Sequence, residues 1–144
     1  MGKEGSRKED TWREAAEDES VLLNVMLESV PTEYRDVLAK QAEAIRVRFD
    51  CECGCPSVSF EVPEAAPLAG NYSHVAGAGY AYFDDSENPF SLELFIREGK
   101  LRGYDVTPMV DPPSPQAKLI RIERRGTNGT TEVIWTRSAS SDAN

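Results

Sequence analysis

The hydrophobic pattern of this chain changes its period once, near Arg46, and this change constrains the fold more than any other feature. Before Arg46, apolar residues recur every three or four positions, as they do on one face of an α-helix. After Arg46, apolar and polar residues alternate, as they do in a strand with one buried face. Helices followed only by strands are typical of an α+β fold with an antiparallel sheet.

Two amphipathic helices are expected before the change. Thr11 and Glu14 have the spacing of a capping box, which predicts a helix start. The first apolar stripe consists of Leu22, Leu23, Met26 and Val30. Pro31 interrupts the pattern because it lacks an N–H group and restricts the residue before it. The second stripe consists of Tyr34, Val37, Leu38, Gln41, Ala42 and Ile45.

Alternating runs after Arg46 predict an antiparallel sheet of about five to seven strands, onto which the two helices pack. Glu98-Gly99 and Asn128-Gly129 are the expected tight turns of two hairpins. Whether the last hairpin joins the main sheet stays open. The alternating runs cover residues 47–53, 57–62, 72–83, 90–97, 101–106, 119–124 and 132–136.

The length of 144 residues fits one domain. Residues 1–18 are polar and charged and are expected to form a largely disordered arm. Residues 19–137 form the single α+β domain, with the helices in 19–45 and the sheet in 46–137. The small polar residues 138–144 predict a disordered tail.

The charge is strongly acidic, with 25 Asp and Glu against 16 Lys and Arg and a net charge of −9. This balance argues against nucleic acid as the partner, because binding phosphates requires a basic face. No apolar run approaches the roughly 20 residues of a membrane-spanning helix. The N-terminus also lacks the apolar core of a signal peptide, so a cytoplasmic location is expected.

All three cysteines, Cys51, Cys53 and Cys55, fall within five residues. Thiolates bind zinc or copper(I), and His74, the one histidine of the chain, would complete a Cys3His set. Zinc sites, however, favour a gap of two or more residues within each cysteine pair. A redox role is a second alternative, although no CxxC motif is present to lower a thiol pKa.

The favoured interpretation of the cluster is structural. Cys51 and Cys53 continue the inward phase of Val47 and Phe49, and free cysteine is among the most frequently buried residues. An odd number of cysteines without a secretion signal also does not suggest a disulfide framework. Cys51 and Cys53 are therefore predicted to lie in the core, with Cys55 in the turn.

Two charged clusters are candidate interaction surfaces. Asp84, Asp85 and Glu87 form an acidic segment that lacks the central glycine and closing glutamate of a calcium loop. A solvated turn explains this segment better than a metal site, and it is the proposed contact for a basic protein partner. The basic residues of the last hairpin, with Trp135 opposite, have two interpretations: a contact for an acidic partner or RNA, or a charged edge strand, which is favoured. These residues are Lys118, Arg121, Arg124 and Arg125.

Several motifs resemble a family of small bacterial proteins, often from high-GC actinobacteria, whose activity is not established. They are Cys-Gly-Cys-Pro-Ser-Val at 53–58, Leu-Phe-Ile-Arg-Glu-Gly-Lys-Leu at 94–101 and Tyr-Asp-Val at 104–106. The resemblance covers residues 20–111, and the hairpin from Gln116 departs from it. It implies the order of the elements and a cytosolic setting, but no activity, cofactor or catalytic residue.

The chain is expected to be non-catalytic, because His74 is its only imidazole and no G-x-S-x-G elbow is present. The favoured function is a protein-binding or regulatory module that meets a basic partner through its acidic surface, as an immunity protein does with a toxin. The alternative is a metal-binding or redox-active protein that uses Cys51, Cys53 and Cys55.

Thiol titration with elemental analysis of anaerobically purified protein separates these alternatives. If the cysteines are core residues, the protein contains no stoichiometric metal, and its three thiols react only after unfolding. A stoichiometric metal that is lost in Cys53→Ser would instead establish a metal site at the cluster.

Overall fold

The computed structural model describes residues 11–49, 56–84, 88–108, 117–125 and 128–137. It confirms the predicted α+β fold, with two helices that precede an antiparallel sheet of seven strands. The helices are α2 (Glu17–Leu27) and α3 (Thr32–Ala42). The strands are β1 (Arg46–Phe49), β2 (Val58–Glu61), β3 (His74–Phe83), β4 (Phe90–Arg97), β5 (Lys100–Pro108), β6 (Leu119–Arg125) and β7 (Thr131–Thr136).

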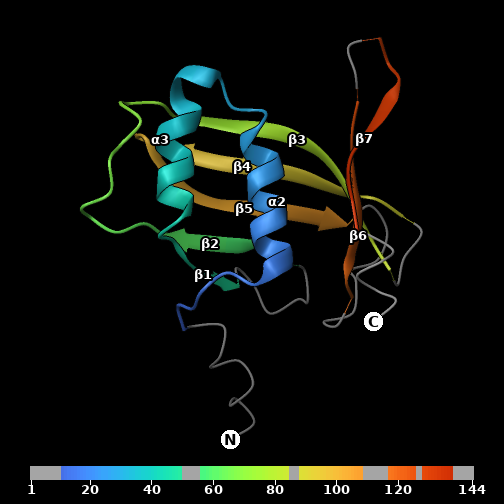
Figure 1. The fold of residues 1–144 in the computed structure, drawn as a ribbon, viewed down its shortest axis with the longest axis horizontal. Coiled ribbons are helices and arrows are strands. Elements are labelled where there is room, and N and C mark those ends of the chain that lie inside the picture. The colour runs from blue at the N-terminus through green and yellow to red at the C-terminus, as the bar shows by residue number, and fades with distance from the viewer. Residues whose placement is uncertain (1–10, 50–55, 85–87, 109–116, 126–127, 138–144) are drawn as a thin grey trace, which may run out of the picture.

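The strands lie in the order β1-β2-β5-β4-β3-β6-β7, and all neighbouring strands are antiparallel. Figure 1 shows that both helices lie side by side on one face of the sheet. The β6–β7 hairpin joins the main sheet through β3, and its strands stand beside the helical layer (Figure 1). The last hairpin is therefore part of the main sheet, a point that the sequence leaves open.

The core lies between the helices and the sheet. Strand β4 follows the predicted alternation, since Phe90, Leu92, Leu94 and Ile96 are buried and the residues between them are not. The predicted first stripe is buried as well, with Leu22, Leu23 and Met26 in α2 and Val30 after its end. Helix α3 ends at Ala42, so the helical part is shorter than the predicted 19–45.

The predicted capping box at Thr11 and Glu14 is wrong. Helix α2 begins at Glu17, and the Glu19 carboxylate accepts a hydrogen bond of 2.8 Å from the Ala16 N–H. The other half of a capping box is missing because an alanine side chain cannot accept a hydrogen bond. The residues before the helix instead follow the edge of the sheet.

The segment just before α2 is anchored to the sheet by Arg13, although it lies within the residues 1–18 for which the sequence predicts a largely disordered arm. The backbone of Arg13 exchanges two hydrogen bonds with Val47 on the outer side of β1, at 3.0 and 2.7 Å. Its guanidinium forms two more with the Glu19 carboxylate, at 2.7 and 2.8 Å. Backbone pairing with a distant strand is not encoded in the local pattern, which explains the difference.

Asp18 joins the start of α2 to the last hairpin. One oxygen of its carboxylate accepts a hydrogen bond from the Leu119 N–H at 3.1 Å. The other oxygen accepts one from Arg137 at 2.6 Å, and Arg137 also donates to the Leu119 carbonyl at 2.9 Å. This network links the N-terminus of α2 to β6 and to the residue that follows β7.

Gln41 joins α3 to the β4–β5 turn from inside the core. Its side chain is fully buried, and its amide N–H groups donate to the carbonyls of Pro67 and Gly99 at 2.7 and 2.8 Å. Its carbonyl accepts a hydrogen bond from the Leu101 N–H at 2.9 Å. The amide is therefore satisfied in a place without bulk water, where a polar group is costly if unpaired.

The β4–β5 turn itself requires glycine at position 99. Glu98 and Gly99 form the predicted tight turn, and both have positive φ angles, 53° and 77°, as in a type I′ turn. A Cβ atom at position 99 would lie 2.4 Å from the Gly70 carbonyl oxygen, which is too close for any side chain.

Replacing Gln41 with alanine should lower the free energy of unfolding by about 2 kcal/mol or more, because it leaves the buried Leu101 N–H without an acceptor and removes the donor to the Pro67 carbonyl. The Gly99 carbonyl keeps its hydrogen bond from the Ala69 N–H. Urea denaturation measures this change. Lys40→Ala, in the same helix but exposed, should change stability by less than about 0.5 kcal/mol. Equal losses in the two variants would contradict the role of Gln41.

Candidate functional site

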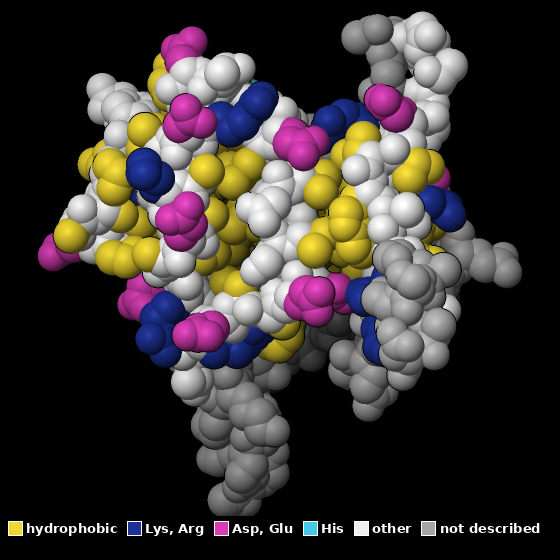
Figure 2. All heavy atoms as spheres, in the orientation of Figure 1, with side chains coloured by type: hydrophobic (Ala, Val, Ile, Leu, Met, Phe, Trp, Pro, Cys, Tyr) yellow, Lys and Arg dark blue, Asp and Glu magenta, His cyan; other side chains and the backbone are white. Residues whose placement is uncertain are grey.

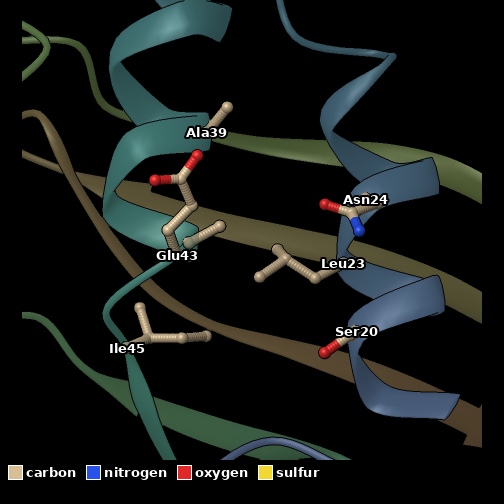
Figure 3. Close-up of a pocket in the computed structure, with 7 residues that line it drawn as sticks. Ser20, Leu23, Asn24, Ala39, Glu43 and Ile45 are labelled. Atoms are coloured by element: carbon tan, nitrogen blue, oxygen red, sulfur yellow. The ribbon is translucent and has the colours of Figure 1, made fainter. Parts of the chain in front are cut away.

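A groove of about 450 Å³ lies between α2 and α3 on the outer face of the helical layer. Figure 2 shows apolar atoms in this hollow, with carboxylate side chains around it. Its lining residues come from both helices and from the segment that follows α3 (Figure 3). They are Ser20, Leu23, Asn24, Ala39, Ala42, Glu43 and Ile45.

The groove exists because the facing positions of the two helices carry small side chains. Ser20 and Asn24 lie one turn apart on α2, and Ala39 and Ala42 lie three positions apart on α3. Neighbouring helices usually fill the space between them with interlocking large side chains. Here Leu23 and Ile45, both nearly buried, form an apolar floor and leave the space above it open.

The rim of the groove is polar and acidic. The Asn24 amide points across the groove from α2, and the Glu43 carboxylate lies opposite, at the end of α3 (Figure 3). In the described part of the chain, Glu43 has no ion-pair or side-chain hydrogen-bond partner. An exposed carboxylate beside an apolar floor is suited to a cation on an apolar stem.

The helical layer is acidic as a whole. Between residues 17 and 43 the chain has seven acidic side chains and two basic ones. Asp18 and Glu19 are committed to Arg137 and Arg13, and Arg35 donates to the Glu28 and Val30 carbonyls after α2. The acidic side chains are Glu17, Asp18, Glu19, Glu28, Glu33, Asp36 and Glu43.

The candidate metal ligands Cys51, Cys53 and Cys55 lie outside the described residues. His74 is exposed at the start of β3, with its ring centroid 5.9 Å from that of Tyr72. Among the described residues, no group of three or more His, Cys, Asp or Glu side chains could hold a metal ion.

The register places His74 and the residues flanking the cysteine cluster at different ends of the sheet. His74 pairs with Ile96, which pairs with Leu101. Ser57, two residues after Cys55, accepts a hydrogen bond from the Val106 N–H at 2.9 Å. Val106 lies five positions after Leu101 in β5, or about 16 Å along the strand. His74 and Ser57 thus lie far apart along the strand direction, and the cysteines themselves are outside the described residues.

Asp84, one of the three acidic residues proposed to bind a partner, forms hydrogen bonds within the protein. Its carboxylate accepts a hydrogen bond from the Lys118 N–H at 3.0 Å, and its own N–H donates to the Lys118 carbonyl at 2.9 Å. These bonds close the ends of β3 and β6. Asp85 and Glu87 lie outside the described residues, so the acidic segment as a whole stays a prediction.

The prediction that the basic residues of the last hairpin lie on an edge strand is wrong. Strand β6 is an inner strand, between β3 and β7. Arg121 lies over the Tyr82 ring at 4.0 Å and within 2.7 Å of the Glu123 carboxylate. Arg124 donates to the Val25 carbonyl at 3.3 Å. These arginines make contacts within the protein.

Tyr104 is the most perturbed titratable group among the described residues. Its side chain is 1 % exposed, and its hydroxyl has no hydrogen-bond partner. Burial, aided by the nearby Glu19 carboxylate, raises the pKa of Tyr104 well above its ordinary value of 10.0. The hydroxyl is buried, and Tyr104 does not line the groove.

Comparison with known proteins finds no family model, no curated protein and no solved structure that matches this chain. The resemblance to small bacterial proteins thus remains a prediction. No helix among the described residues is long and apolar enough to cross a membrane.

The groove was not predicted from the sequence, although part of its signal is visible there. Ser20, Asn24, Ala39 and Glu43 flank the two apolar stripes, and small residues beside such a stripe indicate loose packing between helices. The sequence does not show that these two flanks face each other. That placement depends on where the sheet holds each helix.

The buried phenol leads to a prediction about alkaline pH. The folded protein holds the Tyr104 proton above pH 10, where the unfolded chain loses it, so the stability contributed by this group falls as pH rises through that range. Tyr104→Phe removes this dependence and an unpaired hydroxyl. Its free energy of unfolding near pH 7 should match or exceed that of the wild type. Urea denaturation at neutral and alkaline pH measures both effects; a Phe variant with an unchanged alkaline slope contradicts the assignment.

Proposed function

We propose that this protein is a non-catalytic binding module that takes a basic segment of a partner protein into the groove between α2 and α3. The observation that carries the proposal is the combination of an apolar floor, Leu23 and Ile45, with an acidic rim at Glu43. A small-molecule enzyme site would be expected to contain perturbed titratable groups. Among the lining residues, Glu43 is the only titratable one.

The chemistry of the groove defines the segment that fits. Lysine and arginine have long aliphatic stems, which pack on apolar surface, and charged ends, which remain near water. Such a stem would lie on Leu23 and Ile45, and its charge would reach the Glu43 carboxylate at the rim. The Asn24 amide and the Ser20 hydroxyl offer further hydrogen-bond acceptors from α2.

The net charge of −9 acts over a longer distance and supports the same partner. A strongly acidic protein attracts basic partners and increases their rate of encounter, most of all at low salt. This attraction does not by itself select one basic protein over another. The shape and the apolar floor of the groove supply the selection, as in an inhibitory protein that captures a basic target.

Reversing the charge at Glu43 tests this function. Short synthetic peptides that carry Arg or Lys beside Leu or Met are titrated into ¹⁵N-labelled protein, and amide shifts report the site. We expect peptide-dependent shifts at Leu23, Asn24 and Ala39, and an affinity at least about tenfold lower in Glu43→Lys.

Glu64→Lys is the matched control, because it makes the same change in net charge at an exposed loop residue that does not line the groove. It should retain an affinity within about twofold of the wild type. If both variants lose affinity equally, only the net charge matters. If the shifts map to another face, the groove is not the site.

A further inference from the structure

We propose that strand β7 pairs with β7 of a second copy of this chain, so that two sheets join edge to edge in a weak symmetric dimer. This inference is independent of the proposed function, because β7 contributes no residue to the groove. The two outer strands of the sheet, β1 and β7, differ in whether another segment of the chain pairs with their outer side.

The edge at β1 is closed by the chain itself. Arg13 occupies the outer side of Val47 with two backbone hydrogen bonds. Two arginines of the same strand, Arg46 and Arg48, are further obstacles to a second strand, because charged side chains protect edges from pairing.

The edge at β7 has no such closure among the described residues. Strand β7 pairs only with β6, and no other described segment bonds to its outer side. Its sequence, Thr131-Glu132-Val133-Ile134-Trp135-Thr136, has β-branched and aromatic residues, a single charge and no proline or glycine. Such a sequence on an open edge favours pairing with another strand.

The side chains of β7 are also exposed. Val133 is 52 % exposed, and Thr131, Glu132 and Thr136 are exposed as well. Figure 1 shows the β6–β7 hairpin standing clear of the helices, so a second copy can approach its edge without meeting the helical layer. A bulge at Ile134 interrupts the inner register, which limits regular pairing to short runs on either side of it.

A second copy fits this edge because β7 is complementary to itself. Antiparallel pairing about a two-fold axis near Val133 places the exposed Val133 side chains of the two copies together. It sets Glu132 opposite Ile134 and avoids placing the two Glu132 side chains opposite each other, where like charges repel. The local charge of the edge therefore does not oppose the dimer.

The interface is small, and both copies are acidic. Interfaces below about 1,200 Å² in total are usually weak and transient, so the dimer should form reversibly as the concentration rises. Each copy has a net charge of −9, and salt screens the repulsion between them. Dimer formation should therefore strengthen with salt, which is opposite to the salt dependence expected for a basic partner in the groove.

Sedimentation equilibrium of the full chain at several concentrations, at low and high salt, tests the proposal. We expect a monomer–dimer equilibrium that shifts toward the dimer at high salt. Val133→Lys places two like charges together at the axis and should lower the association constant at least about tenfold. Because Val133 is exposed, this variant should keep the thermal unfolding midpoint of the wild type.

Leu68→Lys is the matched control, since Leu68 is also 52 % exposed but lies in the loop between β2 and β3. It should dimerise as the wild type does. A monomer at every concentration and salt condition would overturn the proposal. A dimer that Val133→Lys leaves intact, or that both lysine variants weaken equally, would overturn it as well.

Discussion

The fully buried side-chain amide of Gln41 fixes the position of α3 on the sheet, and one wall of the groove depends on it. Its three hydrogen bonds reach Pro67, Gly99 and Leu101, so one residue ties the helix to the loop after β2 and to the β4–β5 turn. Hydrophobic burial alone would allow α3 to slide or rotate on the sheet, because apolar contact has little direction. Buried hydrogen bonds have strict geometry, and leaving one unmade is costly. The amide therefore determines where Ala39 and Glu43 lie along the groove.

Helix α2 is held in place by side-chain hydrogen bonds at both of its ends. Asp18 connects its first turn to Leu119 and Arg137, and Arg124 donates to the Val25 carbonyl in its last turn. Acidic groups near a helix start and basic groups near its end also interact favourably with the helix dipole. Because each helix is anchored to the sheet, neither depends on close packing against the other. This independence explains how small residues at their facing positions leave a groove without loosening the fold.

The pattern of the sequence predicts the fold well because periodicity is local. The stripe of α2 and the alternation of β4 follow from neighbours within a few positions, and both appear in the structure as expected. Gln41 also appears in a predicted stripe, but its partners lie up to 60 residues away in the chain, so its role as an anchor is not visible locally. The same limit explains the misplaced helix start, since Arg13 pairs with the distant Val47. It also explains why the prediction that β6 is an edge strand is wrong. Its basic residues are typical of an edge, but β3 and β7 pair with its two sides.

Some acidic side chains of this protein are paired within the fold, and others are exposed and without an ion-pair partner among the described residues. Only the second group is available to bind another molecule. Two carboxylates in the first turn of α2, Asp18 and Glu19, are paired with arginines and backbone N–H groups, and so stabilise the fold. Glu43 lies outside those networks, beside an apolar floor. An acidic exterior attracts any basic protein, so it can set the rate of encounter but not the identity of the partner. The proposed selection of one partner therefore rests on the groove between α2 and α3, where, in the described part of the chain, the Glu43 carboxylate lies beside the apolar side chains of Leu23 and Ile45.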